Sequence, residues 1–143
     1  MSAYIDTSAL AKCYVREPQS LRVLEWADGH GAPVTAALTL VEFRCLLARR
    51  RRGGQIDEKL EQRALAEFDS HVRSGAWHIH PTPFSDYAGA RDLIDILPGV
   101  PLRALDAIHL AAARACGTTD FATADKTQAE AAAALGLTVH RFY

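Results

Sequence analysis

The feature that most constrains the fold of this chain is a regular alternation of short apolar runs with longer stretches of helical periodicity. The short runs have the length and residue types of buried strands, and they cover residues 3–5, 33–36, 77–80, 121–123 and 137–142. Strands that alternate with helices favour an α/β fold with a central, mostly parallel five-stranded sheet and helices on both faces. In such folds, ligands bind beyond the carboxyl ends of the strands, where the strand order reverses.

The segments between these runs carry signals for helix starts and stops. Asp57 is a candidate cap for one helix, and Thr39 is a candidate cap for a helix that contains Glu42 and ends at Gly53-Gly54. The remaining helices are predicted over 8–15, 19–27, 85–97, 102–116 and 126–135.

Length and composition limit the class of protein. The 143 residues fit one domain, 1–143, and the net charge of −1 means that nucleic-acid binding would depend on local basic clusters. The first residues lack the basic and apolar regions of a signal peptide, and no apolar run approaches the roughly 20 residues needed to span a bilayer. The three cysteines form no CxxC pair, so we expect a cytoplasmic protein with no membrane association, zinc site or disulfide framework.

Four scattered carboxylates are the candidate functional residues. Asp6 ends the first run, Asp125 follows the fourth, Glu42 is expected in the first turn of its helix, and Asp106 is expected inside an apolar helix. An ionised carboxylate among apolar residues is costly unless it is paired or bound to a cation, so Asp106 is the most informative of the four. Oxygen ligands without a histidine or cysteine cluster favour Mg²⁺ or Mn²⁺ over Zn²⁺.

Each acid also has a purely structural interpretation. Asp6 and Asp125 are typical helix N-caps, and Glu42 near a helix start would interact favourably with the helix dipole. Asp120 is a rival to Asp125 as the last acid of the group.

The histidines are expected to be structural. His109 follows Asp106 by three residues, and a lone histidine on an apolar helix is more often structural than a ligand. His78 and His80 share a strand face, but no third nitrogen or sulfur ligand lies near them in the sequence.

Four segments together resemble a known family: Tyr4–Leu10, Leu40–Glu42, Leu105–Ala111 and Phe121–Asp125. Their order, residue types and spacing are similar to those of PIN-domain proteins, specifically the VapC-type toxins of type II toxin–antitoxin pairs. The resemblance implies a PIN-like three-layer α/β sandwich and a metal-dependent endoribonuclease, with Mg²⁺ as the cofactor and Mn²⁺ as an alternative. It also implies inhibition by a VapB-like antitoxin protein and a homodimeric assembly.

The resemblance assigns catalytic roles to four acids and supporting roles to two hydroxyl groups. The acids are Asp6, Glu42, Asp106 and Asp125, and the hydroxyl groups are those of Ser8 and Thr123. The predicted mechanism is hydrolysis of RNA phosphodiester bonds by a metal-activated water. Asp6 and Asp106 are the expected direct metal ligands, whereas Glu42 and Asp125 would bind the metal, hold its waters or orient the attacking water.

Three alternatives stay open at this point. The basic run of Arg49, Arg50, Arg51 and Arg52 is a candidate contact for RNA or for the antitoxin, or a solvated helix end. The chain could also be a catalytically inactive PIN-fold binding module. Another metal-dependent phosphoesterase is the third alternative, although a phosphatase of the haloacid dehalogenase class would need an aspartate at the position of Ser8.

Overall fold

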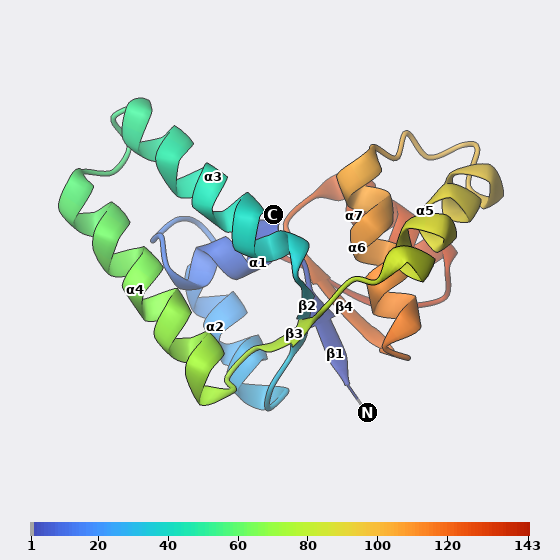
Figure 1. Ribbon diagram of the computed structural model, residues 1–143, viewed down its shortest axis with the longest axis horizontal. Coiled ribbons are helices and arrows are strands. Elements are labelled where there is room, and N and C mark those ends of the chain that lie inside the picture. Colours follow the sequence, from blue (N-terminus) through green and yellow to red (C-terminus); the bar gives the residue numbers. More distant parts are fainter. Residues whose placement is uncertain (1) are drawn as a thin grey trace.

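A computed structural model describes residues 2–143 and places a five-stranded sheet between two layers of helices (Figure 1). The strand order is β3-β2-β1-β4-β5, and every neighbouring pair is parallel. The prediction of a PIN-like α/β fold is therefore confirmed, and the sheet is parallel throughout. The strands are β1 (Ala3–Ile5), β2 (Val34–Ala36), β3 (His78–His80), β4 (Asp120–Thr123) and β5 (Thr138–Arg141).

The helices divide between the two faces of the sheet in sequence order. The helices that precede β3 in the sequence pack on one face, and those that follow β3 pack on the other (Figure 1). None of the helices within residues 2–143 combines the length and apolar character needed to cross a membrane. The helices are α1 (Thr7–Leu10), the 3-10 turn η1 (Ala11–Cys13), α2 (Ser20–Gly29), α3 (Leu38–Arg52), α4 (Glu58–Ser74), α5 (Phe84–Ile96), α6 (Ala104–Ala115) and α7 (Lys126–Ala134).

Alternation along the strands creates two cores. Ile5 faces the side of α1 to α4, where it joins the cluster that contains Phe43 and Phe68. Tyr4 faces the opposite side and stacks on Phe121, with ring centroids 5.3 Å apart. These side chains are almost completely buried, and each contributes about 1.5–3 kcal/mol to the driving force for folding. Both faces of β1 are covered, which explains why its residues are all apolar.

Helices α3 and α4 form a long hairpin that extends beyond the sheet (Figure 1). The turn between them uses Gly54 at a φ of +75°, a conformation that favours glycine. Asp57 caps α4 by accepting a hydrogen bond from the Leu60 amide at 2.8 Å, which confirms the predicted helix start.

The predicted starts of two helices were wrong by two residues or less, which changes the positions of Glu42 and Asp106 within their helices. Helix α3 begins at Leu38, and the hydroxyl of Thr39 pairs with that of Thr35 at 2.7 Å instead of capping the helix. Glu42 therefore lies in the second turn and not in the first. Helix α6 begins at Ala104, because Arg103 still has an extended backbone with a ψ of 166°.

The strand order reverses beside β1, which has β2 on one side and β4 on the other. The carboxyl ends of β1 and β4 are held together by the Asp6 amide, which donates to the Ala122 carbonyl oxygen at 3.1 Å. This is the position where a parallel α/β sheet is expected to place a binding site.

Candidate active site

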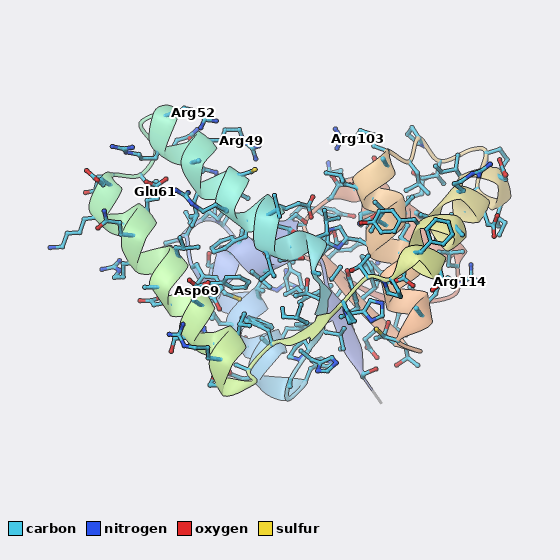
Figure 2. All side chains as sticks on the ribbon, in the orientation of Figure 1. Arg49, Arg52, Glu61, Asp69, Arg103 and Arg114 are labelled. Atoms are coloured by element: carbon cyan, nitrogen blue, oxygen red, sulfur yellow. The ribbon has the colours of Figure 1, made fainter. Side chains whose placement is uncertain are left out.

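The four predicted acids line a single pocket of about 510 Å³ at the carboxyl edge of the sheet. Two arginines, Arg49 at the end of α3 and Arg103 before α6, reach its rim from opposite sides (Figure 2). The pocket thus combines an acidic interior with a basic rim. The acids that line it are Asp6, Glu42, Asp106 and Asp125.

Asp6 is the most deeply buried of these acids, with only 3% of its surface exposed. Its Oδ1 accepts hydrogen bonds from the Ser8 hydroxyl at 2.7 Å and from the Ala9 amide at 3.0 Å, and its Oδ2 accepts one from the Thr123 hydroxyl at 2.5 Å. Burial raises the pKa of Asp6, against the opposing effects of nearby His109 and of these hydrogen bonds. A buried carboxylate that is costly to ionise is one that a bound cation would stabilise.

Ser8 and Thr123 form the connection between β1 and β4 beneath the pocket. The Ser8 hydroxyl accepts a hydrogen bond from the Ala124 amide at 2.9 Å, and the Thr123 hydroxyl accepts one from the Asp125 amide at 3.0 Å. Both hydroxyl groups also donate to Asp6. The contacts expected of the two hydroxyl groups are therefore present, and they fix the orientation of the Asp6 carboxylate.

Glu42 is held by side chains from two other elements. Its Oε1 accepts hydrogen bonds from the Thr7 hydroxyl at 2.7 Å and from Nε2 of His109 at 2.6 Å. Partial burial of Glu42 opposes its ionisation, but the hydrogen bonds from His109 and Thr7 outweigh this effect, so the pKa of Glu42 is lowered. Glu42 is therefore a carboxylate at neutral pH, with Oε2 as the oxygen that remains for the pocket.

A chain of hydrogen bonds lies behind Glu42. The Ala36 amide donates to the Tyr4 hydroxyl at 3.1 Å, and this hydroxyl lies 2.7 Å from Nδ1 of His109. Nε2 of His109 carries a proton toward Glu42, because a carboxylate oxygen can only accept. Burial raises the pKa of Tyr4 well above its usual value, so this hydroxyl keeps its proton.

Asp106 does not lie where the sequence placed it. It is the third residue of α6, and its Oδ2 accepts a hydrogen bond from the Arg103 amide at 3.3 Å. The Arg103 guanidinium lies 3.6 Å from the same oxygen, but this side chain is exposed, so the ion pair contributes little. The predicted position of Asp106 inside the helix is therefore corrected to the first turn, where an acid also has a structural role of its own.

Asp125 combines both interpretations that the sequence allowed. Its Oδ1 accepts a hydrogen bond from the Gln128 amide at 2.8 Å and so caps α7, while its side chain also lines the pocket. The rival acid Asp120 lies at the opposite end of β4 and contacts His140. The fold thus places Asp125, and not Asp120, with the other acids.

The donor set of the pocket fits a hard divalent cation, because it consists of carboxylate and hydroxyl oxygens around a buried, negatively charged centre. The four carboxylates are not drawn into a tight cluster, however. Among residues 2–143, the group of three ligand atoms that lie within 4.8 Å of one another consists of His30, Asp120 and His140, elsewhere in the fold. Asp6 is the strongest candidate ligand in the pocket, since it is buried and its orientation is fixed from three directions.

Comparison with known proteins agrees with this geometry. The family model for the PIN domain matches residues 3–134. The chain belongs to the PIN-domain family. This PIN domain is 34% identical over 139 residues to ribonuclease VapC46 of Mycobacterium tuberculosis, with 95% of this chain and 94% of the relative covered. The resemblance to VapC-type proteins that the four segments carried is thus confirmed.

Solved structures show the same fold. The PIN domain superposes on the M. tuberculosis toxin VapC20, described as cleaving the sarcin–ricin loop, with a TM-score of 0.72, 18% identity and coverage of 96% of this chain and 97% of that one. It also superposes on VapBC2 from Rickettsia felis, solved bound to a promoter DNA fragment, with a TM-score of 0.70, 14% identity and full coverage of both chains. At these identities the likeness concerns the fold alone.

The four arginines of the basic run are not equivalent in this PIN domain. Arg49 lines the pocket, whereas Arg50 forms an ion pair with Glu17 at 2.8 Å. Arg51 lies 3.8 Å from Glu58, and Arg52 is exposed near the end of the hairpin (Figure 2).

For two residues of the pocket in this PIN domain, the sequence did not predict the contact with Glu42, although His109 was expected to be structural. Thr7 and His109 hold Glu42, but both lie far from it in the chain, and no local pattern indicates their pairing. A weak signal was available for His109, because its spacing of three residues from Asp106 places the two side chains on one face of α6.

Proposed function

We propose that this PIN domain is a metal-dependent endoribonuclease and acts as the toxin of a toxin–antitoxin pair. The observation that carries the proposal is the convergence of four carboxylates from four separate chain segments on one pocket, with buried Asp6 at its base. The names of its relatives, which are ribonucleases, support RNA as the substrate.

The residues of the pocket would have different roles in hydrolysis. Asp6 and Asp106 would hold a divalent cation, Mg²⁺ or Mn²⁺, directly. Such a cation lowers the pKa of a water molecule and stabilises charge on the leaving oxygen. Glu42 and Asp125 would complete the binding of the cation or orient the attacking water in line with the scissile bond. Ser8 and Thr123 would keep Asp6 in place through the hydrogen bonds they donate.

Glu42 is suited to accept a proton from the attacking water. The two hydrogen bonds it receives both reach Oε1, so its orientation is fixed while Oε2 can face the substrate side. Because His109 and Thr7 lower the pKa of Glu42, the residue is in the proton-accepting form at neutral pH.

The test is cleavage of a mixed RNA pool by the purified chain, with Mg²⁺, with Mn²⁺ and with a chelator. Asp6→Asn and Asp106→Asn should each lower the rate by about 1,000-fold, equivalent to roughly 4 kcal/mol of transition-state stabilisation. Asp69→Asn is the matched control, because Asp69 is exposed on α4 away from the pocket. Undiminished cleavage by both pocket variants would refute the assignment of the site.

Arg49 is the member of the basic run that we propose to contact RNA, because it lines the pocket. A lysine or arginine that neutralises one phosphate adds about 0.9 to the slope of log binding constant against log salt for duplex nucleic acid, and about 0.7 for a single strand. Arg49→Gln should therefore weaken RNA binding and flatten the slope by nearly one. Arg63→Gln on α4 is the control, and an equal slope for both variants would contradict the contact.

The antitoxin partner and the homodimer are also proposals. A VapBC complex among the structural neighbours supports a VapB-like partner for this chain. Light scattering of the purified chain should give the mass of two copies, and co-expression with the product of a neighbouring short reading frame should yield a complex that no longer cleaves RNA. A monomer, or cleavage unaffected by that product, would contradict the respective proposal.

Two alternatives predict different outcomes of the same experiments. An inactive PIN-fold binding module would cleave no RNA with any cation, and calorimetry would detect no binding of a metal ion. Another metal-dependent phosphoesterase would hydrolyse small phosphate esters and leave RNA intact.

A further inference from the structure

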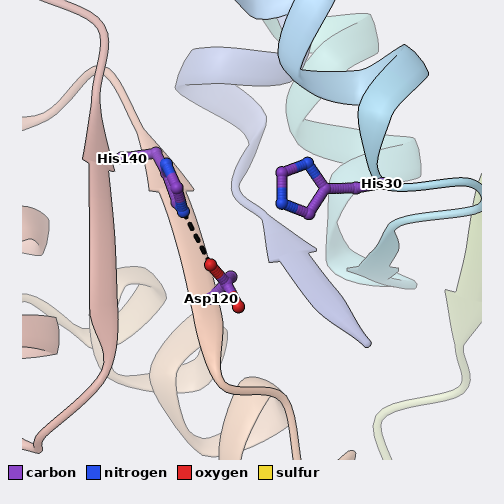
Figure 3. Close-up of side chains that lie close together, drawn as sticks. All are labelled: His30, Asp120 and His140. Carbon is purple, nitrogen blue, oxygen red and sulfur yellow. Dashed lines mark hydrogen bonds and ion pairs between the residues drawn. The ribbon is translucent and has the colours of Figure 1, made fainter. Parts of the chain in front are cut away.

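Three ligand-type side chains that do not line the carboxylate pocket lie close together (Figure 3). His30 follows α2, Asp120 begins β4, and His140 belongs to β5. One ligand atom from each residue lies within 4.8 Å of the other two. Asp120 and the pocket are at opposite ends of β4, about 10 Å apart along the strand at roughly 3.3 Å per residue.

The sheet and one helix bring these three residues together. Asp120 pairs in register with Thr138, so side-chain alternation places His140 on the same face as Asp120. His140 reaches back to Asp120, with Nε2 2.7 Å from Oδ1. Helix α2 packs on this face through Trp26, whose indole lies 5.7 Å from the His140 ring, and the end of the helix carries His30 above the pair.

His30 is held in an orientation that leaves one nitrogen available. Its Nδ1 lies 2.6 Å from the Trp26 carbonyl oxygen, which can only accept a hydrogen bond, so Nδ1 is the donor there and Nε2 is the nitrogen that remains for a cation. The ring also stacks on the Trp26 indole, with centroids 4.4 Å apart and planes at 27°. A histidine whose second nitrogen donates to a backbone carbonyl is the usual arrangement of a metal ligand.

The Asp120 carboxylate is also held in a fixed orientation. The Thr119 hydroxyl donates to Oδ2 at 2.8 Å, which leaves Oδ1 directed at His140. A simple ion pair of His140 with Asp120 makes no use of His30, whereas a cation site uses all three residues.

We propose that His30, Asp120 and His140 form a second metal site, specific for a borderline divalent cation of the Zn²⁺ class. Two imidazoles and one carboxylate are a common set of three protein ligands for Zn²⁺, with water as the fourth ligand. Imidazole nitrogen favours Zn²⁺, Ni²⁺ or Cu²⁺, whereas the all-carboxylate pocket favours Mg²⁺ or Mn²⁺. The two sites therefore differ in ligand chemistry as well as in position.

The geometry needs only a small adjustment. With bonds of about 2.0–2.1 Å, tetrahedral ligand atoms lie roughly 3.3 Å apart. His140 and Asp120 would open slightly from their present 2.7 Å, and His30 would move toward them from within 4.8 Å. A bound cation would then tie the edge strand β5 to the end of α2 and stabilise the folded state.

The test is calorimetric titration of the full chain, without a polyhistidine tag, with Zn²⁺ in excess Mg²⁺. The excess Mg²⁺ occupies sites that consist of carboxylates alone. Wild-type protein should bind one Zn²⁺, and His30→Ala and His140→Ala should each weaken that binding by about 100-fold or more, beyond the usual effect of losing an outer-sphere partner. His78→Ala removes an exposed histidine on β3 and should bind as wild type does.

A second measurement, the Tm with and without Zn²⁺, distinguishes loss of the metal site from misfolding of a variant. Zn²⁺ should raise the Tm of wild type and of His78→Ala but not that of His30→Ala, and His140→Gln replaces His140→Ala if the latter does not fold. Histidine NMR of the wild type should show Zn²⁺ shifting the imidazole signals of His30 and His140. Absence of Zn²⁺ binding in excess Mg²⁺, or binding by His30→Ala equal to that of wild type, would overturn the proposal.

Discussion

The two halves of the carboxylate pocket are held in place by different means. Asp6 and Glu42, the tertiary-held pair, receive hydrogen bonds from side chains that are distant in sequence, Thr123 and His109. Asp106 and Asp125, the helix-start pair, accept hydrogen bonds from backbone amides three residues away. Asp6 also caps α1 by accepting from the Ala9 amide, as the sequence predicted. What distinguishes the first pair is therefore its additional hydrogen bonds from side chains of other elements, which depend on packing, whereas the hydrogen bonds of the second pair depend on local helix geometry.

Because of this difference, substitutions in the two halves of the pocket should affect activity and stability in different ways. Asp125 can lose its charge and still cap α7, because asparagine caps a helix as well as aspartate does. Asp106 is the third residue of α6 and not its cap, so this argument applies to Asp125 alone. A tertiary-held acid cannot be changed without affecting its partners, and its ionisation is coupled to burial. The predictions below test this difference, in order of decreasing expected effect.

The largest effect is expected from His109→Ala. The variant removes the hydrogen bonds to Glu42 and to the buried Tyr4 hydroxyl, so it should lower the free energy of unfolding by about 1–3 kcal/mol. Because His109 lowers the pKa of Glu42, the acid limb of the pH–rate profile for RNA cleavage should move to higher pH. Thr7→Val is the matched control, since it removes the other bond to Glu42 without affecting Tyr4. An acid limb at its wild-type position in His109→Ala would contradict the coupling.

Asp6→Asn should become more stable relative to wild type as the pH rises, while it lowers the rate of cleavage by about 1,000-fold. Folding raises the pKa of Asp6 above its ordinary value of 3.8, so wild-type stability falls as pH rises from 3.8 through the folded-state pKa. The variant lacks this ionisation, so the difference in free energy of unfolding between variant and wild type should move in favour of the variant between pH 3.8 and pH 7, as measured by urea unfolding in a chelator. A difference that does not change with pH would show that ionised Asp6 is not costly.

For Glu42, the dependence of stability on pH has the opposite sign to that for Asp6. Its lowered pKa gives the wild type a stability that is present above pH 4.5 and is lost as pH falls through the folded-state pKa. Glu42→Gln should therefore lose stability at pH 7 relative to wild type, and the difference should shrink on acidification. Urea unfolding over the same pH series measures both acids of the tertiary-held pair.

Asp125 allows a direct separation of capping from catalysis. Asp125→Asn keeps the cap on α7, so its stability should stay within about 0.5 kcal/mol of wild type, whereas Asp125→Ala should lose about 1 kcal/mol. Both variants lose the charge and should be equally impaired in cleavage. Full activity of Asp125→Asn would leave Asp125 with a capping role alone.

The smallest effect concerns a thiol at the pocket. Cys45 is exposed and lines the pocket beside Glu42, whereas burial raises the pKa of Cys13 to about 12. A maleimide should therefore label Cys45 before Cys13 and reduce cleavage several-fold by obstructing the pocket. Cys45→Ser should be insensitive to the reagent, and inhibition of that variant would place the blocking thiol elsewhere.

The sequence predicted the fold well because its signals are local. Apolar runs gave the five strands to within about a residue or two, and Asp57 indicated the start of α4. Asp6 and Asp125 could be assigned to one edge because parallel strands end on the same side of a sheet. The position of Asp106 within its helix was predicted incorrectly, since the extended backbone of Arg103 shifts the helix start by two residues.

By itself, then, the sequence determined the layered α/β fold and the four acids as candidates, through periodicity, capping residues and four family-like segments. The tertiary structure decided which side chains hold them. The pairing of Glu42 with His109 spans 67 positions, and the group of His30, Asp120 and His140 joins a helix end to two strands. Such contacts depend on strand order and helix packing, which place distant residues side by side without any local pattern in the chain.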